Sequence, residues 1–269
     1  MSASHAGSKH GKGLSFPRIL ASEWIKLRTL RSTWITYAVA LIVAIGLGAL
    51  FSLGNGLDFH RHPTTDGIDA TTPSLMGAVL FGQLVVGVIG VLTITGEYAT
   101  GMIRASVSAV PKRTPFLLGK ALVFGLATAV IALVMSFGAF LVGQLVLSQW
   151  GLDTSLGGSG AIRAIFSAAF YITVVGLIGL GLGFALRNTG GAIASLFAIV
   201  FVLPLVVSAL PASWSTHISK YLPLHMAGDL VANDGGAASL SHAAAVGLLA
   251  AYAVAALGLG LVVLKRRDV

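Results

Sequence analysis

Six long stretches of this sequence contain no charged residue, and they constrain the fold more than any other feature. The 269 residues include 17 Lys+Arg and 9 Asp+Glu, or 10%, whereas soluble domains carry about 25%. Each stretch is longer than the roughly 20 apolar residues that cross a bilayer core of about 30 Å. The charge-free stretches are 32–57, 70–96, 121–152, 164–186, 188–219 and 235–264. The sequence therefore predicts an all-α polytopic membrane protein. It excludes a soluble enzyme, a secreted disulfide scaffold and a nucleic-acid-binding domain as descriptions of the whole chain.

We expect one domain of six transmembrane helices over residues 16–267, after a disordered basic tail at residues 1–15. The third helix is long enough to tilt in the bilayer or to extend beyond it. The predicted spans lie at about 33–53, 75–95, 117–147, 162–186, 191–210 and 243–264.

The basic residues predict the orientation of these spans. Six spans place both termini on one side, and fourteen of the 17 Lys+Arg fall in the segments on that side. Cytoplasmic loops carry the excess of Lys and Arg in membrane proteins. We therefore expect both termini in the cytoplasm. The three basic residues on the opposite side are Arg61, Arg163 and Lys220.

Small residues in the fourth predicted span form a helix-packing pattern. Gly179 and Gly183 are four residues apart, and Gly176 precedes them. Such residues let helix backbones approach closely in lipid. The pattern fits packing within one subunit or a dimer face.

The segment before the first span predicts an amphipathic helix. Its apolar residues recur at helical spacing and line one face. Basic residues lie elsewhere, which is typical of a helix in the headgroup layer of an anionic leaflet. Such a helix either sets the topology or also contacts a cytoplasmic partner, and Glu23 is its one acid. The apolar residues are Phe16, Ile19, Leu20, Trp24, Leu27, Leu30 and Trp34.

The connector between the second and third spans, residues 96–120, is long enough to hold its own element. Residues 100–110 are small and apolar and predict a short helix that ends before Pro111. Glu97 is either a surface carboxylate paired with Arg104 or part of a docking element for another protein. In the second case, Arg104, Lys112 and Arg113 meet acidic groups of that partner.

The last extracellular connector, residues 211–242, predicts two short amphipathic helices at 212–222 and 225–232, broken at Pro223. Trp214 and Tyr221 suit the membrane–water interface. The pair forms either a lid over a pathway or an inert interfacial cap. His217 and His225 lie too far apart, with no third ligand nearby, to predict a metal site.

The patterns of several catalytic machineries are missing. Neither Gly11-Lys12 nor Gly119-Lys120 completes a P-loop, and no H-E-x-x-H occurs. The charge-free stretches also lack the carboxylates and lysines that mark ion relays in pumps. We therefore expect no catalytic residue, no metal and no cofactor bound by this chain. A protein with a cytoplasmic docking element and no engine of its own suggests an ATPase partner.

Three motifs occur in a fixed order along this chain. The first precedes the first span, the second follows the second span, and the third precedes the sixth. The motifs are Glu23-Trp24-Ile25-Lys26-Leu27-Arg28-Thr29-Leu30-Arg31-Ser32, then Gly96-Glu97-Tyr98-Ala99-Thr100-Gly101 through Arg104, Pro111, Arg113 and Lys120, and finally Lys220-Tyr221-Leu222-Pro223. In this order and with six spans, they resemble the permease subunit of bacterial type-2 ATP-binding cassette (ABC) exporters. Many relatives have Gly-Thr where this chain has Gly101-Met102.

The resemblance implies roles for three segments. By this resemblance, residues 16–32 form a connecting helix on the inner leaflet. Part of residues 97–113 forms a coupling helix seated in a cleft of the ATPase, and residues 211–242 form re-entrant or gate helices. The implied site residues are Glu23, Trp24, Lys26, Arg28 and Arg31 in the connecting helix, Glu97, Tyr98, Gly101, Arg104, Pro111 and Arg113 in the coupling loop, and Trp214, Tyr221 and Pro223 in the gate.

The resemblance also implies an assembly and an activity. Two permeases, identical or different, pair with two cytoplasmic ATPase subunits that use ATP and Mg, in the plasma membrane of a bacterium. The complex exports a hydrophobic or amphipathic substrate from the cytosol or the inner leaflet, with membrane lipid and no nucleic acid as a further partner. The alternative is a non-transporting scaffold or immunity protein that recruits a cytoplasmic partner through the same loop.

Overall fold

The computed structural model describes residues 15–62, 69–109, 113–158, 160–232 and 240–266, which form helices and no strand. Almost all of the predicted N-terminal tail lies outside these residues, as does Pro111. Four short helices accompany the long ones: α1 (Phe16–Thr29), α5 (Met102–Ala109), α10 (Ala212–Ser219) and α11 (Pro223–Val231).

Within the described residues, six helical segments are long and apolar enough to cross a membrane, so the predicted fold class is confirmed. Three are single helices: α2 (Arg31–Arg61), α7 (Ala161–Leu186) and α12 (His242–Arg266). The second comprises α3 (Thr71–Gly77), a π-helical turn η1 (Ala78–Gly82) and α4 (Gln83–Ala99). The third comprises α6 (Arg113–Leu147) and a 3₁₀ turn η2 (Ser148–Trp150). The fifth comprises α8 (Thr189–Phe197), a π-helical turn η3 (Ala198–Val202) and α9 (Leu203–Ser208).

The short helices also appear where the sequence predicts them. Helix α5 lies within residues 100–110, and the chain between the fifth and sixth spans folds into two helices. Pro223 begins the second of these, at the position where its missing N–H costs nothing and its fixed φ favours a helix. The second helix therefore starts two residues before the predicted 225–232.

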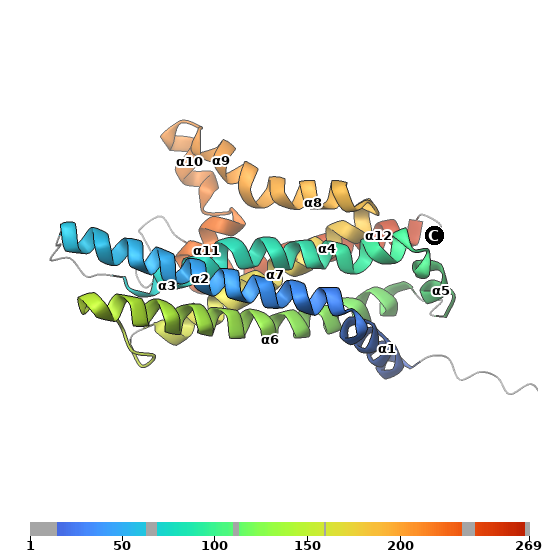
Figure 1. Cartoon of the computed structure of the whole chain (residues 1–269). Coiled ribbons are helices and arrows are strands. Elements are labelled where there is room, and N and C mark those ends of the chain that lie inside the picture. Colours follow the sequence, from blue (N-terminus) through green and yellow to red (C-terminus); the bar gives the residue numbers. More distant parts are fainter. Residues whose placement is uncertain (1–14, 63–68, 110–112, 159, 233–239, 267–269) are drawn as a thin grey trace, which may run out of the picture.

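The bundle has two distinct ends (Figure 1). Helices α1 and α5 and the C-terminal end of α12 lie at one end, which we call the α5 end. Helix α10 lies at the opposite end, which we call the α10 end. The fourteen basic residues that predicted the orientation belong to segments of the α5 end or to residues outside the described ranges.

Glycines let the central helix α7 pack tightly against α4. A Cβ on Gly179 would lie 2.2 Å from the carbonyl oxygen of Gly87, and one on Gly90 would lie 2.2 Å from that of Gly176. These contacts join two helices of one chain, as the packing alternative for Gly179 and Gly183 predicted. Burial differs among the spans: 72% of the most apolar 18-residue window is buried in α7, but only 22% of that window in the fifth span. Helix α9, at the end of the fifth span, stands away from the bundle in Figure 1.

Candidate functional site

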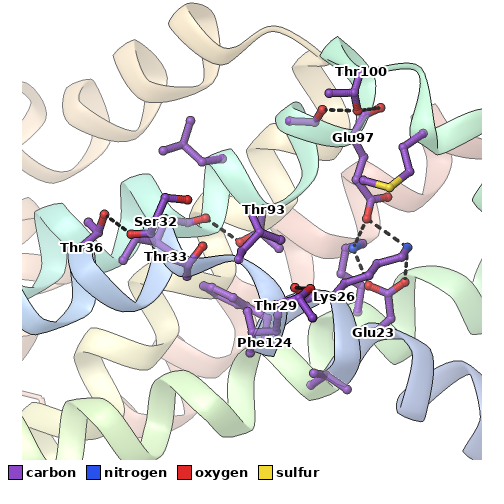
Figure 2. A pocket seen from close by; sticks show the side chains of 18 residues that line it. Glu23, Lys26, Thr29, Ser32, Thr33, Thr36, Thr93, Glu97, Thr100 and Phe124 are labelled. Atoms are coloured by element: carbon purple, nitrogen blue, oxygen red, sulfur yellow. Dashed lines mark hydrogen bonds and ion pairs between the residues drawn. The ribbon is translucent and has the colours of Figure 1, made fainter.

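Four charged side chains meet inside the α5 end, and we call them the ion cluster. Glu23 and Lys26 come from α1, Glu97 from the last turns of α4, and Lys120 from the first turns of α6. The Lys120 ammonium lies 2.5 Å from Glu23 Oε2 and 2.8 Å from Glu97 Oε1. The Lys26 ammonium lies 2.8 Å from Glu23 Oε1 and 3.1 Å from Glu97 Oε1. Figure 2 shows Glu23, Lys26 and Glu97 pointing toward one another from two helices.

Burial makes each member of the ion cluster depend on the others. Glu23 and Glu97 are each 4% exposed and Lys120 is 3% exposed, while Lys26 lies at the edge. The two positive and two negative charges balance. A buried charge left without its partner destabilises a protein by about 3–5 kcal/mol. The ion cluster therefore holds α1, α4 and α6 in one arrangement.

The charge states of Glu23 and Lys26 on α1 agree with this balance of charges. Burial raises the pKa of Glu23, but Lys120 and Lys26 outweigh burial and hold that pKa below its ordinary value. Burial lowers the pKa of Lys26, but Glu23 and Glu97 outweigh it and hold that pKa above its ordinary value. Both residues are therefore charged at neutral pH.

Helix α1 presents Glu23 inward because its buried residues recur every fourth position, at Ile19, Glu23 and Leu27. This row packs against α6, where Gly119 leaves room: a Cβ there would lie 2.7 Å from Ile19 Cγ2. The prediction of one apolar face on this helix is therefore only partly correct. Phe16 and Trp24 are exposed, whereas Glu23, the one acid, lies on the buried face.

The remaining residues predicted for the connecting helix lie on the surface. Arg28 and Arg31 are exposed on either side of Leu30, whose extended backbone separates α1 from α2. Together with Trp24 they form the outward side of this segment. The structure therefore divides the predicted set into an inward pair, Glu23 and Lys26, and an outward group of three.

The surface location predicted for Glu97 is wrong. The prediction paired it with Arg104 or exposed it to a partner, whereas Glu97 is buried and pairs with Lys120 and Lys26. The reason is that Lys26 of α1 and Lys120 of α6 reach the end of α4, so that a carboxylate at the end of the second span meets two lysines instead of water.

Helix α5 is anchored to the ion cluster and exposes the opposite face. Gly101 has φ +71°, a conformation that favours glycine, and it turns the chain from α4 into α5. Ile103 is buried, and Ser106 accepts a hydrogen bond of 3.1 Å from the Lys26 ammonium. Arg104 is exposed. Among the predicted coupling residues that the structure describes, Gly101 and Arg104 are the exposed ones.

Two further predicted residues, Tyr98 and Arg113, tie the α5 end together. The Arg187 guanidinium lies 5.3 Å from the centre of the Tyr98 ring. Arg113 donates hydrogen bonds to the carbonyl oxygens of Leu264 and Lys265 at the end of α12. Both residues are half-buried, so they join spans and do not form an outward surface.

Lys120 is the site residue that the sequence reasoning missed. Lys120 belongs to the second motif but is not one of the site residues that the resemblance implies. A signal was available, because it lies inside the predicted third span, 117–147, and a lysine at that depth needs a partner.

The predicted gate residues lie at the α10 end. Trp214 and Tyr221 are exposed and Pro223 is buried. The Tyr252 hydroxyl of α12 donates a hydrogen bond of 2.9 Å to the carbonyl oxygen of Tyr221. Nothing brings these residues to the ion cluster, at the other end of the bundle.

A cavity of about 510 Å³ lies beside the ion cluster, between α1, α2, α4 and α6. Glu23, Lys26, Glu97 and Lys120 form part of its wall, and threonines of three helices form another part (Figure 2). In the part of the chain that the structure describes, no three His, Asp or Glu side chains gather as metal ligands would.

Comparison with known proteins gives one family. The model of the family described as ABC-2 family transporter protein matches residues 19–204, more than two thirds of the chain. The match begins in α1, includes the whole ion cluster and ends in α9. No curated protein matches the chain.

Proposed function

The chain belongs to the ABC-2 family of transporter proteins, and from that premise we propose that it is an exporter permease whose α5 docks on a cytoplasmic ATPase. Membership and six apolar helices make it a multi-pass membrane permease of an ABC transporter. It is the transport component, without a nucleotide-binding domain of its own, and it associates with an ATP-binding subunit.

The buried ion cluster is the observation that carries this proposal. Ser106 of α5 is bonded to Lys26, Lys26 to Glu97, and Glu97 to Lys120. A displacement of α5 by a docked ATPase therefore acts on α1, α4 and α6 together. This chain of contacts gives the permease a route from a cytoplasmic contact to α1 and to its second and third spans.

The orientation and the assembly belong to the same proposal. The α5 end faces the cytoplasm of a bacterial cell, with the excess of basic residues in support. Two permeases and two ATPases form the working unit, and the ATPases use ATP and Mg. The weakly buried fifth span, with Phe197, Leu205 and Val206 exposed, supports a second permease as a neighbour. The substrate is hydrophobic or amphipathic and leaves the cytosol or the inner leaflet.

Arg104→Glu tests the docking surface because Arg104 is exposed on α5 and lies outside the ion cluster. The tagged permease is co-expressed with its ATP-binding subunit, and co-purification, ATP hydrolysis and ATP-driven transport into inverted vesicles are measured. We expect complex formation to fall about tenfold, the equivalent of one or two lost charge-assisted contacts.

Arg61→Glu is the matched control, because it makes the same charge change at an exposed position of the α10 end. It should bind the ATPase as the wild type does. Normal binding and stimulation with Arg104→Glu would contradict the docking surface. Normal complex formation without any ATP-dependent transport would instead favour a scaffold that recruits the partner.

A further inference from the structure

The cavity beside the ion cluster has the size of a small-molecule site. Its volume of about 510 Å³ falls in the usual range of about 300–1,000 Å³ for ligand pockets. Leu27, Ile89, Val123 and Phe124 form a buried apolar part of its wall. Leu92 is 47% exposed on its rim, on the second span. A hydrophobic molecule can therefore reach the cavity from the lipid.

Four of the six hydroxyl groups in the wall donate their protons within the protein; the other two belong to Ser32 and Thr33. Thr36 Oγ1 donates to the carbonyl oxygen of Ser32, and Thr93 Oγ1 donates to that of Ile89. Thr29 and Thr100 likewise donate to carbonyl oxygens of their own helices. A hydroxyl has one proton and two lone pairs. These four groups therefore offer a ligand acceptors and no donor.

The lysines in the wall are also engaged. The Lys26 ammonium makes three hydrogen bonds, to Glu23, Glu97 and Ser106, which accounts for its three protons. The Lys120 ammonium donates to Glu23 and Glu97 and lies 5.6 Å from the centre of the Phe116 ring. The two ammonium groups that would bind an anionic ligand are therefore already paired.

One strong acceptor is left over. Glu97 Oε1 accepts from both lysines, whereas Glu97 Oε2 is buried without a hydrogen-bond partner among the described residues. A carboxylate oxygen accepts its strongest hydrogen bonds from a charged donor. The cavity thus combines an apolar wall, four hydroxyl groups whose protons are engaged, and Glu97, whose second carboxylate oxygen is buried without a partner among the described residues.

We propose that this cavity binds a hydrophobic molecule with a protonated primary amine. The ammonium donates to Glu97 Oε2 and to threonine oxygens of the wall, and the hydrocarbon body packs against Ile89, Val123 and Phe124. This names a substrate class for the exporter, and the step from binding to export rests on the proposed function. Binding itself is a property of this chain alone.

The test uses the full-length permease in phosphatidylcholine nanodiscs without ATPase, and three dansyl probes of one length. Dansylcadaverine carries the primary ammonium, its N-acetyl derivative keeps an N–H but no charge, and dansyl-6-aminohexanoic acid carries a carboxylate. Dansyl emission rises in an apolar site. We expect the amine to bind at least about tenfold more tightly than either of the others. Equal binding of the acetylated probe or of the acid would overturn the proposal.

Three variants locate the site. Glu97→Gln should weaken amine binding about tenfold by removing the charged acceptor. Gly96→Leu should fill the cavity from its wall, and Gly258→Leu makes the same change on α12. A Cβ at either glycine has no described atom within 4 Å, so a side chain can begin at either position without a clash. Amine binding that survives both Glu97→Gln and Gly96→Leu would place the probe elsewhere and refute the site.

The source of the amine is resolved by lipid composition. Nanodiscs with phosphatidylethanolamine supply a lipid with a primary ammonium headgroup. If this lipid displaces dansylcadaverine, the occupant is a membrane lipid. If it does not, the occupant is a separate amphiphile. Binding without ATP-driven transport of the amine would keep the site and contradict the proposed export, so the two failures are distinguishable.

Discussion

The two ends of the bundle are built in different ways. At the α5 end, charged side chains from three helices are buried together and α5 is fixed to them through Ile103 and Ser106. At the α10 end, none of the described residues of α10 is buried, and Trp214 is 65% exposed. At this end α11 packs on α7 and α12. The comparison indicates that one end transmits a displacement as a unit, while the other has a loosely attached helix that can move.

The largest effect is expected when the ion cluster loses Lys120. Lys120→Met keeps most of the side chain's volume but leaves Glu23 Oε2 and one bond of Glu97 without their buried donor. We expect a loss of about 3–5 kcal/mol in stability, measured by unfolding of the purified protein in detergent. Adding Glu23→Gln removes one excess negative charge, so the double variant should be more stable than the single one. A Lys120→Met protein as stable as the wild type would remove the reason for treating the α5 end as a rigid unit.

The spans were predictable because their signal is local. Long charge-free stretches mark helices without any knowledge of what packs against them. The short helix within residues 100–110 and the second of the two helices around Pro223 were predictable for a similar reason, because a proline marks the predicted end of the first and the predicted break before the second.

The ion cluster was not predictable in the same way, because it depends on three segments that meet in space. Glu23 and Glu97 are 74 residues apart in the chain, and each looks like a surface residue in its own segment. Their burial follows from the packing of α1 against α6 and from the lysines of α1 and α6 that reach Glu97 on α4. Lys120 alone gave a hint, as a lysine within a predicted span.

The second effect concerns pH and is confined to the α5 end. The pKa of Glu23 lies below its ordinary value of 4.5, so its stabilisation is present above pH 4.5 and is lost as pH falls through the lowered value. The pKa of Lys26 lies above its ordinary value of 10.5, so its stabilisation is present below pH 10.5 and is lost as pH rises through the raised value. Thermal unfolding between pH 3 and 11 should therefore show a plateau with a fall at each extreme. Glu23→Gln should weaken the acidic fall, and an unchanged acidic limb would contradict the assignment.

A third effect compares two glycines, one at each end. Gly101 has φ +71° and Gly151 has φ +67°, and a Cβ at either has no described atom within 4 Å. Replacement by alanine costs each protein about 1–2 kcal/mol, because a Cβ disfavours the left-handed conformation. The stability losses should be similar, but only Gly101→Ala moves α5 and reduces ATPase stimulation. Equal loss of stimulation from both would show that coupling does not depend on the α5 end.

The last comparison, which contains the smallest expected effect, is between two tyrosine hydroxyls. Tyr37 on α2 shares a buried hydrogen bond of 2.8 Å with Thr128, so Tyr37→Phe leaves a buried hydroxyl with one partner fewer, at about 1–3 kcal/mol. Tyr252→Phe removes the bond from α12 to the chain between α10 and α11, where water can replace the lost donor, so stability should change by only about 0.5 kcal/mol. Hydrogen exchange separates stability from local motion. We expect faster exchange of the amides of α10 in Tyr252→Phe and no such change in Tyr37→Phe. If α10 exchanges as slowly as before, this helix is held by more than the Tyr252 bond, and the two ends are less different than their burial indicates.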